Sequence, residues 1–343
     1  SKHPTDLTMT NMFARIFRRS ESQPKTIRVL VVEGGGVRGI VTGQILGRLE
    51  AALGGPLRTY FDMMAGTSSG GISVMALATD SLTDAYDLST IFNVRSKDVF
   101  RRAPNPVRLP PLLRGPRYLA EGFMEVASDV LGEGWLSDCK IPTLVTSYLI
   151  EEGRLKVFGS LNEDLEDDYR LVDVARATTA APACFPPAHI TSQQGTSLWG
   201  VDGGVYANAP ILQAITEARR RFGSDCTLEL VSIGPGDAPI TVQSGPAQQW
   251  GGISWLKPAF DIHVHALSEQ THAFVHDQLP NVHLHRLEVD WNTLPEAMRP
   301  TAGLDDFRPR NLARLHDGSL RWLDNNDAKI KVVRNALLHA ALT

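Results

Sequence analysis

The 343-residue sequence contains little cysteine, no long apolar run and no strong excess of either charge. Its three cysteines form no close pair, which excludes a disulfide framework and the familiar zinc-binding spacings. It contains no stretch of about 20 apolar residues of the kind that a membrane-spanning helix needs. The net charge is −4, from 34 basic and 38 acidic residues. This balance argues against DNA binding, because proteins that grip phosphate backbones usually carry a basic surface.

The beginning of the sequence shows no signal-peptide pattern, because Arg15, Arg18 and Arg19 interrupt its apolar residues. We therefore expect the protein in the cytoplasm, where reducing conditions suit unpaired cysteines. Residues 1–26 are polar and are expected to form a flexible leader. Residues 12–19 have the pattern of a short basic amphipathic helix, and one hypothesis is that this helix touches an anionic membrane. The alternative is a frayed leader without a partner.

Strands and helices alternate from Ile27 onward, which predicts an α/β fold with a mainly parallel central sheet. The β-branched run 27–32 predicts a buried strand, and apolar residues recur at helical spacing over 40–53. A second apolar segment, 60–65, precedes a helix predicted over 72–78. Further strands are predicted at 143–150, 155–159, 197–201 and 228–233, and further helices at 119–131, 171–180, 209–222, 259–278 and 328–341.

Residues 27–343 are expected to form a single domain, because the sequence shows neither an internal repeat nor a clean domain boundary. Two loop insertions are expected within it. The segment near 99–118 holds five prolines, and the segment near 236–258 is rich in glycine, proline and glutamine.

The first chemical signal is the pattern Gly66-x-Ser68-x-Gly70, which lies between a predicted strand and a predicted helix. A serine nucleophile is presented on a sharp strand-to-helix turn, where side chains two residues away on either side would clash. The start of the following helix also supplies free N–H groups that favour negative charge. A Gly-x-Ser-x-Gly pattern can arise by chance in a chain of this length. The hypothesis that Ser68 is a nucleophile therefore depends on the position of the pattern between a predicted strand and a predicted helix. The alternative is a glycine–serine turn without chemistry.

The second signal is the triplet Gly34-Gly35-Gly36. Acyl transfer creates an oxyanion that needs N–H donors, and glycines let the backbone approach a substrate closely. We expect these glycines, together with Ser69, to form the oxyanion hole. Arg38 is expected to brace the loop or to face a phosphate. The spacing Gly34-x-Gly36-x-x-Gly39 also matches a dinucleotide fingerprint, so a nucleotide-binding module is the competing class. That alternative lacks its acidic residue at a strand end, and it leaves Ser68 without a role.

The third signal is Asp202-Gly203-Gly204, which follows a predicted strand. An attacking serine needs a group that accepts its proton, and Asp202 meets this need if burial makes it basic enough. A serine–histidine–acid triad is an alternative, because eight of the ten histidines lie after Asp202. That fold usually places several strands before its nucleophile, whereas one strong strand precedes Ser68. We therefore favour a direct Ser68–Asp202 dyad.

Three of the later histidines, His265, His272 and His276, lie at spacings that place them on one helical face. Such a cluster suggests a metal site. No carboxylate or cysteine completes a familiar ligand spacing, so structural histidines are the favoured interpretation and no metal or other cofactor is expected.

These motifs, in this order, resemble the patatin-like phospholipases. The segment 177–187 adds a fourth match, because it is similar to the Ala-Pro and Phe-Pro-Pro block of that family. The resemblance covers residues from about 27 to the Asp-Gly-Gly motif, with weaker similarity in the helix near 259–278. Two departures are noted: Glu33 stands where the family more commonly has Asp, and Cys184 replaces a bulkier residue.

The resemblance implies a three-layer α/β/α fold and hydrolysis of lipid acyl esters by a Ser–Asp dyad, without metal or histidine. It assigns the nucleophile to Ser68, the base to Asp202 and the oxyanion hole to the backbone of Gly34–Gly36. Related acyltransferases usually carry His directly before the serine. Thr67 occupies that position here, which favours hydrolysis over transfer.

Five arginines gather between residues 99 and 119, where no acidic residue occurs: Arg101, Arg102, Arg108, Arg114 and Arg117. One hypothesis makes this stretch a lid or a contact for anionic lipid headgroups at the inner face of the membrane. A second hypothesis follows from resemblance to compact bacterial effectors of antiphage defence, and makes it a contact for a cyclic di- or trinucleotide activator. A solvated loop and an unregulated housekeeping lipase are the plain alternatives. A homodimer is a further hypothesis, without a residue-level argument for its interface.

Overall fold

A computed structural model describes residues 25–105, 115–161, 167–237, 244–249, 251–301 and 303–341. The amphipathic helix expected at 12–19, together with Arg108 and Arg114, therefore lies outside the described residues. None of the helices in the described part of the chain is long and apolar enough to span a membrane.

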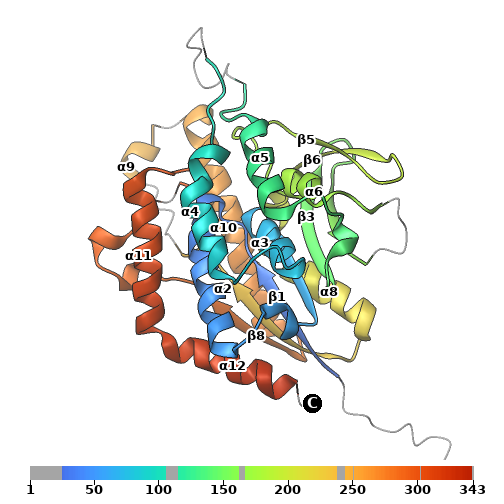
Figure 1. Cartoon of the computed structure of the whole chain (residues 1–343). Coiled ribbons are helices and arrows are strands. Elements are labelled where there is room, and N and C mark those ends of the chain that lie inside the picture. Colours follow the sequence, from blue (N-terminus) through green and yellow to red (C-terminus); the bar gives the residue numbers. More distant parts are fainter. Residues whose placement is uncertain are drawn as a thin grey trace, which may run out of the picture.

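One sheet of eight strands forms the centre of the molecule (Figure 1). Its order is β5-β6-β3-β2-β1-β7-β8, and β4 also pairs with β3. Strands β1, β2, β3, β7 and β8 are parallel to their neighbours in that group, whereas β4, β5 and β6 pair antiparallel. The strands are β1 Thr26–Val32, β2 Met63–Thr67, β3 Thr143–Leu149, β4 Arg154–Gly159, β5 Ala188–Thr191, β6 Ser197–Asp202, β7 Thr227–Ile233 and β8 Val282–Leu287.

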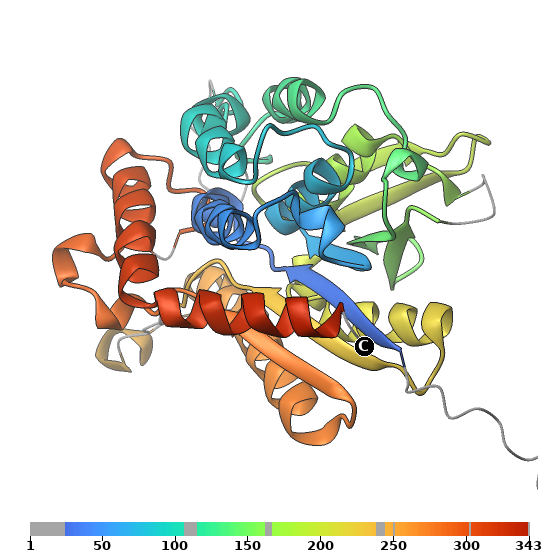
Figure 2. The ribbon, with the colours of Figure 1, turned by 60° about the horizontal axis from the view of Figure 1, so that its bottom comes forward.

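Helices cover both faces of this sheet, as Figure 2 shows from a second direction. One face packs against α2 Gly39–Leu53, α3 Ser69–Ala78, α4 Tyr86–Val99, α5 Ala120–Leu131, α6 Leu171–Thr178, α11 Pro309–Asn325 and α12 Asp327–Ala340. The other face packs against α8 Ile211–Phe222 and α10 Gly252–Gln278. Two short helices, α7 Gly204–Ala207 and α9 Ser244–Ala247, lie in connections. The expected three-layer α/β/α fold is confirmed.

Strand β1 shows how the sequence produces two cores. Leu30 and Val32 point into the core of the α2 face, whereas Val29 and Val31 point into the core of the α8–α10 face. Successive side chains of a strand point to opposite faces, so a strand buried on both sides must be apolar throughout. This explains the mostly apolar run, in which the one charged residue, Arg28, is paired with Asp62, and it places the end of β1 between two helical layers.

Several elements differ from their predicted bounds. The loop prediction for 236–258 was wrong in its last part, because α10 already begins at Gly252 and contains Pro258 near its start. A proline costs least near the beginning of a helix, and tertiary packing here outweighs the signal of the flanking glycines. Sequence patterns also missed α4, α11, β5 and β8. Strand β5 has only four residues, and α4 buries few residues for its length.

Candidate active site

Ser68 occupies the turn between β2 and α3. Its φ of 55° and ψ of −127° lie in a region that a residue with a side chain seldom adopts. The chain is packed tightly here: a Cβ atom on Gly70 would overlap the carbonyl of Val32, and one on Gly66 would overlap the backbone of Gly70. Both flanking glycines are therefore sterically required. The predicted strand-to-helix turn is confirmed.

The Ser68 hydroxyl contacts one carboxylate directly. Ser68 Oγ donates a hydrogen bond of 2.8 Å to Asp202 Oδ2, and the Gly204 amide donates to Asp202 Oδ1 at 2.8 Å. Ser68 and Asp202 are only 9% and 8% exposed. Burial raises the pKa of Asp202 to about 6, although the hydrogen bonds from Gly204 and Ser68 partly oppose the rise. Asp202 is thus a stronger base than an ordinary aspartate and remains mostly ionised at neutral pH.

The sheet register brings together these two residues, which lie 134 positions apart. Strand β3 lies between β2 and β6, so it pairs with both. Thr67, directly before the serine, pairs with Thr146, and Asp202 pairs with the next residue, Ser147. Adjacent positions of one strand therefore fix the spacing between the serine and the aspartate.

Thr178, at the end of α6, is a site residue for which sequence reasoning found no role. Its hydroxyl accepts a hydrogen bond of 2.8 Å from the backbone amide of Ser68. The same hydroxyl donates to the carbonyl of Thr146 at 2.6 Å. It therefore ties the strained serine to β3. The position lies in the segment that resembles the family block, but nothing in the sequence indicates what its hydroxyl contacts.

The glycine loop after β1 passes directly over Ser68. A Cβ atom on Gly34 would lie 3.1 Å from Ser68 Cβ. The Gly34 amide donates to the carbonyl of Asn208 at 3.2 Å, and the Gly35 amide donates to Ser69 Oγ at 2.9 Å. The oxyanion role expected for the Gly34 and Gly35 amides conflicts with these two bonds, and the close approach of backbone to serine is what Gly34 provides. With the described residues, the amides of Gly36 and Ser69 form no hydrogen bond.

Arg38 links the glycine loop to the segment after β7. Its Nη1 donates to the carbonyl of Gly236 at 3.2 Å. Burial lowers the pKa of Arg38, and the nearby carboxylates of Glu288 and Asp261 oppose this change. The contact agrees with the bracing role expected for this arginine.

The arginine segment is less basic than its sequence indicates. Arg101 pairs with Glu125 at 2.8 Å, and Arg117 pairs with Asp305. Arg102 is exposed, and its backbone forms an isolated bridge with Tyr118. Two of the five predicted contact arginines are therefore neutralised by carboxylates from outside the segment, which the local sequence does not show.

The three histidines expected on one helical face have different environments. His272 is buried, whereas His265 and His276 are exposed. No group of three or more metal-ligating side chains is suitably arranged in the described ranges. The histidine triad alternative also loses its basis, because the serine hydroxyl donates to Asp202.

Comparison with known proteins identifies the family. The family model for patatin-like phospholipases matches residues 30–215, more than half of the chain. The chain belongs to the patatin-like phospholipase family. It is 28% identical to a cGAMP-activated phospholipase of Pseudomonas aeruginosa over 285 residues, which cover 82% of this chain and 83% of the relative. It is 30% identical to patatin-like protein 1 of Arabidopsis thaliana, over 72% of this chain and 69% of the relative. A cGAMP-activated phospholipase of Escherichia coli is 31% identical over 58% of each chain.

Membership makes this protein a lipid acyl hydrolase, and the competing class of a non-catalytic nucleotide-binding module is rejected. The glycine loop, Ser68 and Asp202 all lie within the matched residues of this patatin-like phospholipase. Helices α10, α11 and α12 lie beyond them.

Replacing Thr178 tests its role as a support for the nucleophile. The isosteric change Thr178→Val leaves the Ser68 amide and the Thr146 carbonyl without this partner. We expect the free energy of unfolding to fall by about 1–3 kcal/mol, measured by urea denaturation. Thr178→Ser keeps the hydroxyl and serves as the control. Equal stability of the Val and Ser variants would contradict the role.

Asp202→Asn is expected to stabilise the protein at pH 7.5. The folded-state pKa of Asp202, about 6, lies above the unfolded value of 3.8. Stability is therefore fully present below pH 3.8 and declines as the pH rises toward 6. A shift of about two pKa units corresponds to a cost of about 3 kcal/mol when the group is ionised. Asn avoids this cost and can still accept from the Gly204 amide. Thermal unfolding at pH 7.5 and pH 4 measures the effect, and a variant that is less stable at pH 7.5 would contradict it.

Proposed function

We propose that this protein cleaves fatty-acyl esters of membrane phospholipids through an acyl-Ser68 intermediate, with Asp202 as the only base. The observation that carries the proposal is the direct 2.8 Å hydrogen bond between the Ser68 hydroxyl and a buried carboxylate whose pKa is raised to about 6. This arrangement can remove the serine proton without a histidine. The two-residue mechanism agrees with the interpretation drawn from the family resemblance.

The first half of the reaction forms the acyl-enzyme. Ser68 Oγ attacks the ester carbonyl carbon while its proton passes to Asp202 Oδ2. The amides of Gly36 and Ser69 then stabilise the oxyanion of the tetrahedral intermediate, together with the positive end of α3. When the intermediate collapses, the bond to the glycerol oxygen breaks. That oxygen takes the proton from Asp202 and leaves as the lysophospholipid alcohol.

The second half returns the enzyme to its starting state. Asp202, again ionised, accepts a proton from a water molecule as that water attacks the acyl-Ser68 carbonyl. The same amides hold the second oxyanion. Collapse breaks the bond between the acyl group and Ser68 Oγ, which recovers a proton from Asp202. The fatty acid leaves as product.

We further propose that a cyclic dinucleotide of the cGAMP type activates this hydrolysis. Two relatives from different bacteria are cGAMP-activated phospholipases, and one of them aligns with most of this chain. Membrane lipid cleavage under such control fits a role in antiphage defence at the inner face of the cytoplasmic membrane. The unregulated lipase remains the alternative outcome of the experiment below.

The experiment measures fatty acid release from phospholipid vesicles, with and without a panel of cyclic di- and trinucleotides that includes cGAMP. We expect release by the wild-type protein to rise severalfold with one member of the panel. Ser68→Ala and Asp202→Asn are each expected to reduce release by at least about a thousandfold while remaining folded.

Each outcome has a distinct meaning. Equal release with and without every nucleotide supports the unregulated lipase. Activity that survives in folded Ser68→Ala refutes the acyl-Ser68 mechanism. If folded Ser68→Ala is inactive but Asp202→Asn retains activity, a group other than Asp202 accepts the proton of Ser68.

The pH dependence of hydrolysis should report the ionisation of Asp202. Only the ionised carboxylate accepts a proton, so kcat/KM on a neutral, soluble ester is expected to rise about tenfold per pH unit at acidic pH and to level off above about pH 6. The exposed His276 serves as a control, because His276→Gln should leave this midpoint unchanged. A midpoint near pH 4 would show that Asp202 is not shielded from water during the reaction.

A further inference from the structure

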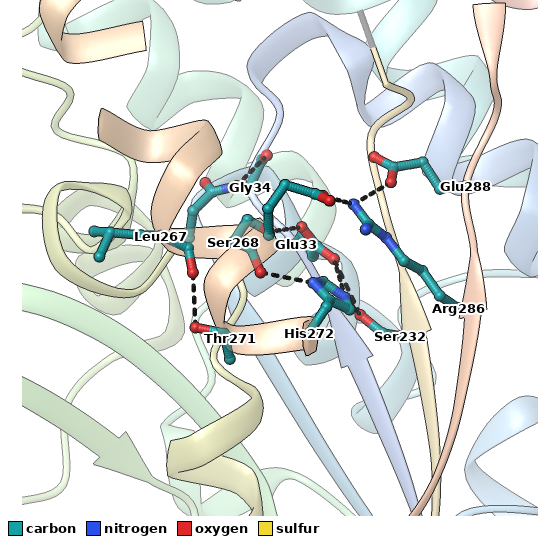
Figure 3. A network of polar contacts seen from close by, with 11 residues as sticks. Glu33, Gly34, Ser232, Leu267, Ser268, Thr271, His272, Arg286 and Glu288 are labelled. Atoms are coloured by element: carbon teal, nitrogen blue, oxygen red, sulfur yellow. Dashed lines mark hydrogen bonds and ion pairs between the residues drawn. The ribbon is translucent and has the colours of Figure 1, made fainter. Parts of the chain in front are cut away.

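The residue before the glycine loop, Glu33, carries a buried carboxylate that the proposed mechanism does not use. It is 2% exposed, and its amide continues the β1–β7 ladder by donating to the Ile233 carbonyl at 3.0 Å. Strand alternation directs its side chain to the face that α10 covers. Figure 3 shows the carboxylate beside Ser268 and His272 of α10, with Gly34 next to it.

Three groups donate to this carboxylate. Ser268 Oγ donates to Glu33 Oε2 at 2.7 Å, Ser232 Oγ donates to Oε1 at 3.1 Å, and His272 Nε2 lies 3.1 Å from Oε1. The other ring nitrogen of His272, Nδ1, lies 2.8 Å from the Ser268 carbonyl. A carbonyl can only accept, so Nδ1 carries a proton, and Nε2 faces a carboxylate that also accepts. Nε2 also lies 3.2 Å from Ser232 Oγ, so the three groups Glu33, Ser232 and His272 form one buried hydrogen-bonded cluster, whose geometry fits an imidazolium beside an ionised Glu33.

The direction of both pKa shifts agrees with this ion pair. Burial alone would raise the pKa of Glu33, but the hydrogen bond and charge of His272 lower it below its usual value. Burial alone would lower the pKa of His272, but Glu33 raises it. Arg286 of β8, which lies beyond β7 in the sheet, adds positive charge, and it is itself paired with Glu269 and Glu288. Removing one member of a buried pair leaves an uncompensated charge, so the pair is sensitive to substitution of either partner.

Helix α10 also contacts the other half of the active site. His263 Nε2 lies 3.3 Å from the carbonyl of Val205, three residues after Asp202. At the glycine loop, the Asn208 side chain donates to the Gly34 carbonyl at 3.2 Å. Helix α10 is thus attached to Glu33, directly before the glycine loop, and to the short helix α7 that follows Asp202.

We infer that Glu33 and His272 are positioning residues. By fixing the glycine loop to α10, they hold its backbone amides at the distance from Ser68 that oxyanion stabilisation needs. The inference rests on the proposed function. It gives a role to two features of the sequence that the reaction itself leaves unexplained. The Glu33 carboxylate reaches both Ser268 and His272 of α10. His272 is the buried member of the histidine cluster.

The test measures kcat and KM separately on a soluble short-chain ester, p-nitrophenyl butyrate, which needs no membrane contact. Glu33→Gln keeps the shape and removes the charge, and Glu33→Asp keeps the charge and shortens the reach. Because the loop matters most when the oxyanion forms, we expect both variants to lower kcat by about 10- to 100-fold and to change KM less than about twofold. Ser268→Ala, which leaves the ion pair intact, should lower kcat less.

The paired action of the two residues is tested by a double variant. If they act as one unit, Glu33→Gln combined with His272→Gln should lower kcat no further than the more damaging single change. Glu229→Gln provides a matched control. Glu229 is a buried carboxylate of β7 that contacts two histidines, His283 and His285, and it has no contact with the glycine loop. This variant should retain wild-type kcat.

The outcomes separate this inference from the proposed function. Activity on the ester that survives in Ser68→Ala refutes the proposed function itself. Loss of activity in Ser68→Ala with unchanged kcat in folded Glu33→Gln and Glu33→Asp refutes only the positioning role. A rise in KM without a fall in kcat also refutes it, because the loop would then act in substrate binding. If Glu33→Gln fails to fold, unchanged kcat in folded Glu33→Asp overturns the inference.

Discussion

The hydrogen bond between Ser68 and Asp202 sets the requirements for the rest of the molecule. A serine–histidine–acid site uses an imidazole whose pKa is already near neutral, whereas this site must raise the pKa of a carboxylate. Burial supplies that rise, and the resulting value of about 6 leaves Asp202 largely ionised at neutral pH yet far more basic than an exposed aspartate. The site must therefore remain shielded from water on the side of Asp202. Strand β6 meets this need because Asp202 pairs with Ser147 inside the sheet.

Backbone geometry determines most of the other features of the site. The serine lies in a strained turn, backbone amides meet the oxyanion in the proposed mechanism, and the glycines are needed because the chain segments nearly touch. Strain of this kind persists only when the surroundings determine it from several directions. Here the Thr178 hydroxyl holds the Ser68 amide, and Asn208 holds both polar groups of Gly34. The free energy that these contacts contribute offsets the cost of the turn and of the buried carboxylate.

The parts of the site that the sequence could predict are those in which the backbone dictates the residue type. Glycines beside Ser68 and before the oxyanion loop are required by close packing, so they form a readable pattern at fixed spacing. Thr178 and His272 could not be predicted, because a threonine in a helix or a histidine on a helix has many ordinary explanations. Their roles depend on partners more than 100 residues away in the chain. The same reasoning applies to Arg117, whose charge is neutralised by Asp305 from a distant loop. For the fold, strands buried on both faces were predictable from their apolar runs, but β8 alternates histidines with apolar residues and gave no clear signal.

The position of the Glu33–His272 pair relates the family's common core to the rest of this chain. The nucleophile, the base and the glycine loop all lie within residues 30–215, but the helix that fixes the loop lies beyond them. The Glu33 carboxylate reaches across to this helix, where Ser268 and His272 face it. The other ring nitrogen of His272, Nδ1, needs no acidic partner, because it donates to the Ser268 carbonyl one turn earlier in the same helix. The two residues depend on each other, because without Glu33 burial would lower the pKa of His272, and without His272 the pKa of Glu33 would rise. The Glu33–His272 contact thus joins the glycine loop of the matched region to a helix outside it.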